Sequence, residues 1–308
     1  MIFASIDIGS NAIRLLFANI FENDKGALAS ARTAFIRVPI RLGGDVFFKG
    51  TISPEREQKL LKTLAAFKTL IEANDAVAYD AVATSAMREA SNGAQIITRI
   101  EKELGLRVRI IDGQEEAEII REAGEVSANS AFPMTMFVDV GGGSTEISVQ
   151  QGNHFVNSRS FNLGTLRLLS GTTDPEEWTR LNDWLMQFED YFGEIECVGS
   201  GGNINKIAKV FGNKEKKTIT LKQSEKAYKN LSALSVSERM KAYNLRADRA
   251  DVIVPALEIY LKIMKTIEAG YIVAPKIGLA DGLIVNLYKK MSSRTNQSVQ
   301  DDNMQILN

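Results

Sequence analysis

One motif occurs twice in this chain, and the repetition restricts its architecture. Residues 5–11 read S-I-D-I-G-S-N, and residues 137–144 read F-V-D-V-G-G-G-S. In both places an apolar run ends in an acid, a glycine-containing turn follows, and a second apolar run begins. This order predicts a β-hairpin at each site. The recurrence of the hairpin predicts two similar domains that face each other.

The segments after the first motif alternate in their hydrophobic pattern. Ser53 is suited to cap a helix that has Pro54 in its first turn, and apolar residues follow at helical spacing. Further along the chain, strands are expected over 80–84 and 107–111, and helices over 96–104 and 114–126. This alternation predicts an α/β fold.

The length of 308 residues suits two domains, each with its own core. We expect the boundary in the polar stretch 127–130. Residues 1–126 would then form an N-terminal domain and residues 127–308 a C-terminal domain. The polar tail from about residue 292 is expected to be frayed or disordered.

Composition excludes several kinds of chemistry. The chain has one Cys and one His, so a disulfide within the chain is impossible and a Cys/His zinc site would consume both residues. A Ser-His-Asp site would depend wholly on His154, and a Cys-His site on Cys197 together with His154. If the protein is a hydrolase, we therefore expect its base to be a carboxylate.

The sequence also indicates where the protein works. No stretch reaches the roughly 18 uninterrupted apolar residues of a membrane span. The N-terminus has no basic region before its apolar run, which argues against a signal peptide. A single free Cys fits a reducing compartment. We expect a cytoplasmic protein without a membrane or nucleic-acid partner.

Glycine-rich turns follow apolar strands at residues 9–11, 141–145 and 199–203, and a fourth precedes a helix at 278–282. Glycine lets successive backbone N–H groups converge on phosphate oxygens. The string G-x-x-x-x-G-K-[ST] does not occur, which excludes a Walker-type nucleotide site. No G-x-G-x-x-G follows the first strand, which weakens the case for a dinucleotide fold.

Acidic side chains stand beside these turns. Asp7 and Asp139 end equivalent strands, and Glu146 lies seven residues after Asp139, so a hairpin brings the latter two carboxylates to one end. Carboxylates next to phosphate-binding turns suit Mg²⁺. Glu115 and Glu116 open a helix, and they either join this group or merely complement the positive end of that helix.

Other polar residues have two explanations each. Arg88 follows a strand and either holds a phosphate bidentately or pairs with Glu89. Asn11 is either a turn residue or a phosphate ligand. Residues 203–249 hold 12 Lys and Arg against four Asp and Glu, a net charge of +8. This segment is either a set of solvated helix faces or a surface that attracts polyanions.

Five segments, in order, give the chain a family resemblance: A-S-I-D-I-G-S-N-A-I-R-L-L, A-T-S-A-M-R-E-A, G-Q-E-E-A-E-I-I, F-V-D-V-G-G-G-S-T-E and V-G-S-G-G-N-I-N-K. They resemble the exopolyphosphatase/guanosine-pentaphosphate phosphohydrolase (Ppx/GppA) family over nearly the full chain, in its short two-domain form. The resemblance implies the duplicated actin-like, sugar-kinase-like and Hsp70-like ATPase fold of ribonuclease H type, with the active site in the interdomain cleft.

The resemblance also implies roles for single residues. Glu116 matches the catalytic glutamate that orients or deprotonates the attacking water. Asp139 and Glu146 match acidic positions of catalysis and metal binding, and we expect Asp7 to join them on the metal. The positions expected to hold phosphate are Asn11, Arg88, Gly141, Gly142, Gly143, Ser144, Thr145, Gly201, Gly202 and Asn203.

The activity implied is Mg²⁺-dependent release of terminal orthophosphate from inorganic polyphosphate. Two alternatives stay open. The same groups could remove the 5′-terminal phosphate of guanosine pentaphosphate, or the chain could bind a nucleotide or phosphate without hydrolysing it. Joint retention of Glu116, Asp139 and Glu146 favours hydrolysis. The resemblance also implies a homodimer.

Overall fold

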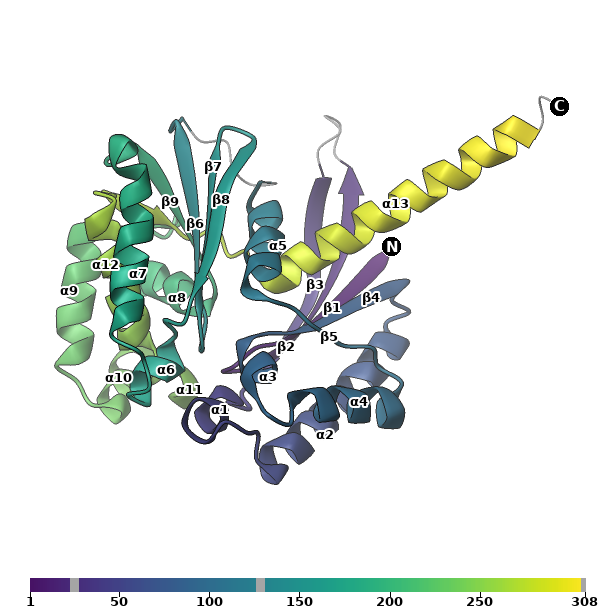
Figure 1. The fold of residues 1–308 in the computed structure, drawn as a ribbon, viewed down its shortest axis with the longest axis horizontal. Coiled ribbons are helices and arrows are strands. Elements are labelled where there is room, and N and C mark those ends of the chain that lie inside the picture. The colour runs from purple at the N-terminus through teal and green to yellow at the C-terminus, as the bar shows by residue number, and fades with distance from the viewer. Residues whose placement is uncertain (23–27, 126–130, 306–308) are drawn as a thin grey trace.

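The computed structural model describes the backbone of residues 1–22, 28–125 and 131–305 and the side chains of residues 1–21, 30–124 and 131–292. The expected boundary at 127–130 lies outside the described residues. The chain forms two lobes, each built on one β-sheet with helices packed against it (Figure 1).

The first sheet has the strand order β3-β2-β1-β4-β5. Its strands are β1 (Ile2–Ile8), β2 (Ile13–Glu22), β3 (Leu28–Val38), β4 (Ala78–Ala83) and β5 (Arg109–Ile110). The hairpin predicted at the first motif is the antiparallel pair β1 and β2, and β3 continues it as a meander. On the other side of β1, β4 and β5 are added in parallel.

The second sheet has the order β10-β11-β9-β6-β7-β8. Its strands are β6 (Met134–Val140), β7 (Thr145–Gln151), β8 (His154–Phe161), β9 (Ile195–Ser200), β10 (Thr218–Thr220) and β11 (Tyr271–Val273). Again three antiparallel strands form a meander, and β9 and β11 follow in parallel on the far side of the first one. The same order in both sheets confirms the duplicated α/β, actin-like architecture.

Helices cover both sheets. In the first lobe they are α1 (Gly43–Lys49), α2 (Pro54–Ala73), α3 (Ser85–Glu89) and α4 (Gly93–Leu104). The next helix, α5 (Gly113–Glu125), packs with α13 (Leu279–Gln305) and against β6, β7 and β8 of the second sheet. In the second lobe the helices are α6 (Thr165–Leu169), α7 (Glu176–Leu185), the 3₁₀ helix η1 (Met186–Tyr191), α8 (Gly202–Phe211), α9 (Leu221–Ser232), α10 (Val236–Tyr243), α11 (Ala247–Ala250) and α12 (Ile253–Thr266). Ser53 caps α2 as expected, because its side chain accepts a hydrogen bond from the Arg56 N–H.

Each lobe buries its own core. In the first, Leu64 and Phe67 of α2 pack with Ile6 of the sheet. In the second, Trp184 of α7 packs with Cys197 of β9. Cys197 is a buried free thiol, and His154 is exposed. Neither lines the cavity described below.

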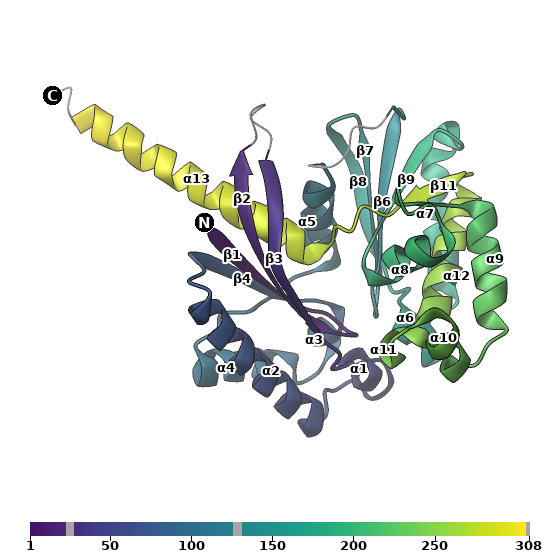
Figure 2. The ribbon, with the colours of Figure 1, turned by 180° about the vertical axis from the view of Figure 1, so that it is seen from behind.

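The last helix, α13 (Leu279–Gln305), returns to the first sheet and crosses it, as Figures 1 and 2 show. Ile284 and Val285 pack with Phe3 and Leu16 of that sheet. The Ser5 hydroxyl donates a hydrogen bond to the α13 backbone at the Ala280 carbonyl, over 2.7 Å. Chain order alone assigned this helix to the unit 127–308, whereas its contacts join it to the first lobe.

The tail differs from the expectation of fraying after residue 292, because its backbone is helical to Gln305. The sequence from Leu283 to Gln305 contains no Gly or Pro. Once the first turns are fixed against the sheet, each added residue forms one more backbone hydrogen bond without a new nucleation cost. Within the described residues, no helix is both long and apolar enough to cross a membrane.

Candidate active site

The turns of the two repeated hairpins line one cavity of about 490 Å³, to which both lobes contribute. In the first turn the Gly9 N–H donates to the Ala12 carbonyl over 3.2 Å. In the second the Gly141 N–H donates to the Ser144 carbonyl over 2.9 Å. The repeated motif therefore forms the same backbone turn twice, and the cavity lies in the interdomain cleft that the resemblance implied.

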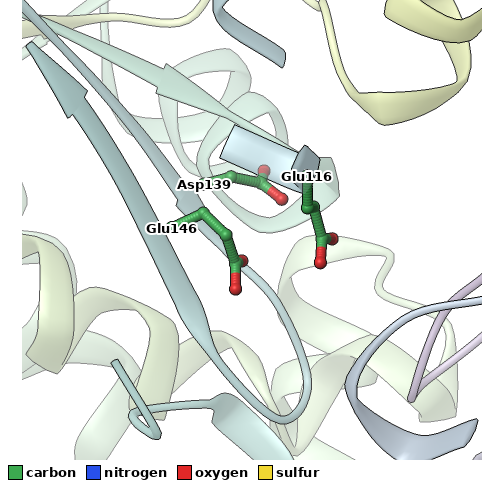
Figure 3. Close-up of side chains that lie close together, drawn as sticks. All are labelled: Glu116, Asp139 and Glu146. Atoms are coloured by element: carbon green, nitrogen blue, oxygen red, sulfur yellow. The ribbon is translucent and has the colours of Figure 1, made fainter. Parts of the chain in front are cut away.

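Three carboxylates converge beside this cavity (Figure 3). Asp139 and Glu146 are cross-strand partners on β6 and β7, and Glu116 projects from the first turn of α5. Oxygen atoms of the three acids lie within 4.8 Å of one another. The sequence therefore placed the hairpin pair correctly, and Glu116 belongs to the cluster rather than only to its helix end.

The start of α5 explains how Glu116 reaches the hairpin. The Asp112 side chain accepts a hydrogen bond from the Glu115 N–H over 2.8 Å, which caps the helix. A Cβ at Gly113 would lie 2.3 Å from the Ser160 Cβ on β8. Only glycine allows this approach, which brings the first turn of α5 against the second sheet.

Burial dominates the electrostatics of the cluster. It raises the pKa of Glu146 to about 7, although hydrogen bonds from Ser144 and Ser160 oppose the shift. It also raises the pKa of Glu116 well above the usual range, and the charges of Glu146 and Asp139 raise it further. The pKa of Asp139 is raised by burial and held back by a hydrogen bond from Ser200.

Two oxygens of the cluster, Glu116 Oε2 and Glu146 Oε2, are buried and have no hydrogen-bond partner among the described residues. Buried polar atoms without partners are costly. A proton shared within the group or a hard cation would relieve that cost, so the donor set fits a divalent metal. It can equally accept a proton near neutral pH.

Asp7 is not one of these three acids, although its charge raises the pKa of both Glu116 and Asp139. It lines the cavity and is buried, but it forms an ion pair with Arg14 across β1 and β2. The charge of Asp7 is the main cause that raises the pKa of the Arg14 guanidinium. The sequence singled out Asp7 as a metal ligand and missed Arg14, although Arg14 lies only three residues after the repeated motif at 5–11.

The glycine turn of the second lobe divides into two groups. Gly141, Gly142 and Ser144 line the cavity, whereas Gly143 and Thr145 do not. The Thr145 hydroxyl instead donates a hydrogen bond to the Leu163 carbonyl over 2.5 Å, which supports the end of the turn away from the cavity.

The third turn, 201–203, also lines the cavity. Gly201 has φ +88°, and a Cβ there would lie 2.9 Å from Asp139 Oδ1. Gly202 and Asn203 begin α8, whose N-terminal end therefore faces the cavity. The predicted residues of this turn are brought together with Asp139.

Asn11 lines the cavity, but its Nδ2 donates to the Asp248 carbonyl over 3.1 Å while its buried Oδ1 has no partner among the described residues. Arg88 does not line the cavity. Its guanidinium donates to the Ile111 carbonyl over 2.7 Å, and its charge lowers the pKa of both Glu116 and Glu146.

Basic side chains make up much of the remaining lining: Arg14, Arg32, Arg37, Lys206, Lys209, Arg249 and Lys276. Burial and the nearby charges of Arg37 and Arg246 lower the pKa of Arg249 to about 10. From the +8 segment, Lys206, Lys209 and Arg249 reach the cavity. These three side chains of the segment are placed to attract an anion. The net charge of +8 did not indicate which of its 12 basic residues would reach the cavity.

Comparisons with known proteins identify relatives of this chain. A guanosine-5′-triphosphate,3′-diphosphate pyrophosphatase of Aliivibrio fischeri is 24% identical over 317 residues, covering 97% of this chain and 62% of the relative. A protein of the same name from Vibrio cholerae is 22% identical, covering 94% of this chain and 60% of its own length. The chain thus spans less than two thirds of these relatives.

Solved structures match most of the chain. An exopolyphosphatase from Cytophaga hutchinsonii has a TM-score of 0.80 at 23% identity, covering 94% of this chain and 98% of that chain. A Ppx/GppA family member from Aquifex aeolicus has a TM-score of 0.74 at 27% identity, with the same coverage. The model of the Ppx/GppA phosphatase family matches residues 30–291, well over half of the chain. The chain therefore belongs to the Ppx/GppA phosphatase family.

Proposed function

We propose that this chain hydrolyses phosphoanhydride bonds and releases the terminal orthophosphate of inorganic polyphosphate. The observation that carries the proposal is the cluster of Glu116, Asp139 and Glu146 beside amide-rich turns, at a cavity that Glu116 and Asp139 line together with several Arg and Lys side chains. Phosphoryl transfer depends on positioning and on charge stabilisation, and this cavity offers groups for both. Membership of the Ppx/GppA family supports the same chemistry.

The turns are suited to hold the terminal phosphate. Backbone N–H groups of 142–144 and of 202–203, at the N-terminal end of α8, would donate to its oxygens, whereas the N–H groups of Gly141 and Gly201 are bonded within the protein. Asn11 would join them only with its amide turned, because its Nδ2 is engaged by the Asp248 carbonyl. Arg88 acts from outside the cavity, and its charge favours the ionised forms of Glu116 and Glu146.

Mg²⁺ is the cofactor we propose for the acidic cluster, with Glu116 beside the ion and not bound to it. The unpartnered oxygens of Glu116 and Glu146 fit a hard cation that binds a few carboxylates and phosphate oxygens. Such an ion, when bound, neutralises phosphate charge. We propose Asp139 and Glu146 as its ligands. Because Asp7 is committed to Arg14, its role in this proposal is to fix that guanidinium at the cavity wall.

Glu116 is the proposed general base. Its raised pKa makes the carboxylate a better proton acceptor near neutral pH than an ordinary glutamate. It would take a proton from water aligned with the terminal phosphorus, and the shortened polyphosphate would leave on the opposite side. A carboxylate base explains how a chain with one exposed His can carry out hydrolysis.

The test is phosphate release from polyphosphate with and without Mg²⁺, in wild type and Glu116→Gln. We expect release to fall at least about 100-fold in Glu116→Gln while polyphosphate binding persists. Glu115→Gln is the matched control, because Glu115 is a neighbouring exposed glutamate paired with Arg109. Equal turnover in Glu116→Gln and wild type would refute the assignment.

Two alternatives share this site. Hydrolysis of guanosine pentaphosphate is favoured by the names of the curated relatives, and competition between the two substrates in one assay separates it from the main proposal. A member that binds phosphates without hydrolysis would release none. Mg²⁺-dependent release without an acceptor molecule would exclude that alternative and a kinase.

We also propose that the chain works as a homodimer in the cytoplasm. The support is the family resemblance and the absence of a candidate membrane helix in the described residues. Light scattering of the purified chain tests the oligomeric state, since a mass of 33.9 kDa would indicate a monomer.

A further inference from the structure

The edge strand β3 presents a basic, an aromatic and a second basic side chain to the cavity. Arg37 is the register partner of Arg14, and Phe35 is the partner of Leu16. The register shift after Phe17 pairs Arg32 with Ala18, which keeps Arg32 on the same face despite its odd spacing from Phe35. All three side chains, Arg32, Phe35 and Arg37, line the cavity.

Phe35 is unusual among these side chains because it is a large apolar group left 49% exposed. Within the described part of the chain it belongs to none of the hydrophobic clusters and makes no ring pair or cation–ring contact. A polyphosphate chain has nothing apolar to place on a phenyl ring. An inorganic polyphosphate therefore leaves the Phe35 ring without an apolar contact.

The neighbours of Phe35 separate it from the acidic end of the cavity. Arg37 lies two residues along the strand, about 7 Å away at the usual strand rise, and pairs with Asp248 of the second lobe. On the other side Arg32 holds Asp281 over 2.7 Å, at the start of α13. The ring therefore lies between two fixed guanidinium groups, while phosphates are drawn toward Arg14 and the glycine turns beside the three acids.

This spacing matches a nucleoside whose phosphates point inward. A phosphate near Arg37 and a base on Phe35 would be joined by one sugar. Base–aromatic stacking is a strong and sequence-tolerant contact, because every base has a π-face. We propose that Phe35 is a stacking platform for a nucleobase, and that it determines whether this site accepts nucleoside polyphosphates in addition to inorganic polyphosphate.

The proposal rests on the proposed function, and its test separates the two. Phosphate release is measured from guanosine pentaphosphate and from short inorganic polyphosphate in wild type, Phe35→Ala and Phe35→Trp. We expect Phe35→Ala to raise KM for the nucleotide about tenfold with kcat unchanged, and to leave KM for polyphosphate unaltered. Phe35→Trp restores the nucleotide KM, since a larger ring still stacks.

The matched control is Phe21→Ala, because Phe21 is also 49% exposed, lies on the neighbouring strand β2 and does not line the cavity. Phe21→Ala should change neither KM nor kcat for either substrate. An equal change in KM for both substrates in Phe35→Ala, or no change in KM for either, would refute the stacking role of Phe35.

Calorimetric binding of guanosine pentaphosphate to the same variants makes the test independent of turnover. If the wild type hydrolyses neither substrate but binds the nucleotide, and Phe35→Ala weakens that binding about tenfold, the platform stands and the proposed hydrolysis fails. If the wild type does not bind the nucleotide at all, the platform is refuted whatever happens to polyphosphate.

Discussion

Asp139 and Glu146 stand directly opposite each other in the register of β6 and β7. Two like charges at such positions destabilise a sheet, and Glu146 is only 2% exposed. Glu116 adds a third acid within reach of both. The three acids therefore destabilise the folded chain. We expect the free energy of unfolding to depend on both pH and bound metal ions.

Without metal, we expect the free energy of unfolding to fall as pH rises. The pKa of Glu146 is about 7 in the folded chain against about 4.3 for an unperturbed glutamate. Between these values the folded state binds more protons than the unfolded state, so stability decreases over that window. The loss from this one group is about 3 kcal/mol, nearly complete by pH 8. Urea unfolding in EDTA at pH 5 and pH 8 measures it.

Glu146→Gln serves as the control for that slope. A glutamine does not titrate, so the variant should lose less stability between pH 5 and pH 8 than the wild type. Some slope remains, because burial raises the pKa of Glu116 and Asp139 in the same direction. Identical pH dependence in the two proteins would show that Glu146 does not have a raised pKa in the folded chain.

Addition of Mg²⁺ should reverse the loss at pH 8. An ion that binds only the folded state stabilises it by RT ln(1 + [L]/Kd), which gives about 2.7 kcal/mol at a hundredfold excess over Kd. The predicted readout is a rise in Tm with Mg²⁺ in the wild type that disappears in Asp139→Asn. A wild-type Tm that does not respond to Mg²⁺ at any pH would exclude the metal site.

The left-handed glycines provide a test with a built-in comparison. Gly201 and Gly193 have φ of +88° and +80°, which L side chains rarely adopt, so alanine strains either backbone by about 1–3 kcal/mol. A Cβ at Gly193 would meet nothing within 4 Å, whereas one at Gly201 would lie 2.9 Å from Asp139 Oδ1. We expect similar losses of stability from the backbone, with a fall in kcat of at least about tenfold in Gly201→Ala alone.

Gly201 belongs to a turn that the sequence predicts. The repeated hairpin, the acid pair at Asp139 and Glu146, and the turn at 201–203 were all visible as local patterns. The side of the hairpin on which an acid lies follows from the two-residue period of a strand. Local periodicity therefore predicted the fold class and the centre of the cluster.

Contacts between distant segments were not visible. Helix α13 packs on the first sheet because of tertiary packing that no local pattern records. The ion pair of Asp7 with Arg14 is local by contrast, because the two residues are register partners seven positions apart in the first hairpin, as Asp139 and Glu146 are in the second. Arg88 looked like a phosphate ligand from its place after a strand, yet its guanidinium is bonded to the Ile111 carbonyl. Its expected alternative partner, Glu89, is bound by a residue 78 positions away.

That residue is Arg167, which joins the two lobes. Its Nη2 lies 2.7 and 2.8 Å from the two Glu89 oxygens, and its Nε donates to the Gly143 carbonyl over 2.9 Å. The guanidinium also lies 4.2 Å from the centre of the Phe47 ring. One side chain of the second lobe thus fixes both the glycine turn and two helices of the first lobe.

We expect Arg167→Ala to lower both stability and phosphate release, because the turn at 141–144 loses its support. Hydrogen bonds to charged groups contribute about 1.5–3 kcal/mol when buried, and the 35% exposure of Glu89 reduces the ion-pair share. A double-mutant cycle with Glu89→Ala should therefore give a coupling energy of roughly 1 kcal/mol. Arg180→Ala is the comparison, since Arg180 forms its ion pairs within α7 and with Asp174, and lies at the surface. A cycle that closes to zero, with unchanged release in Arg167→Ala, would mean that the lobes are held together without this contact.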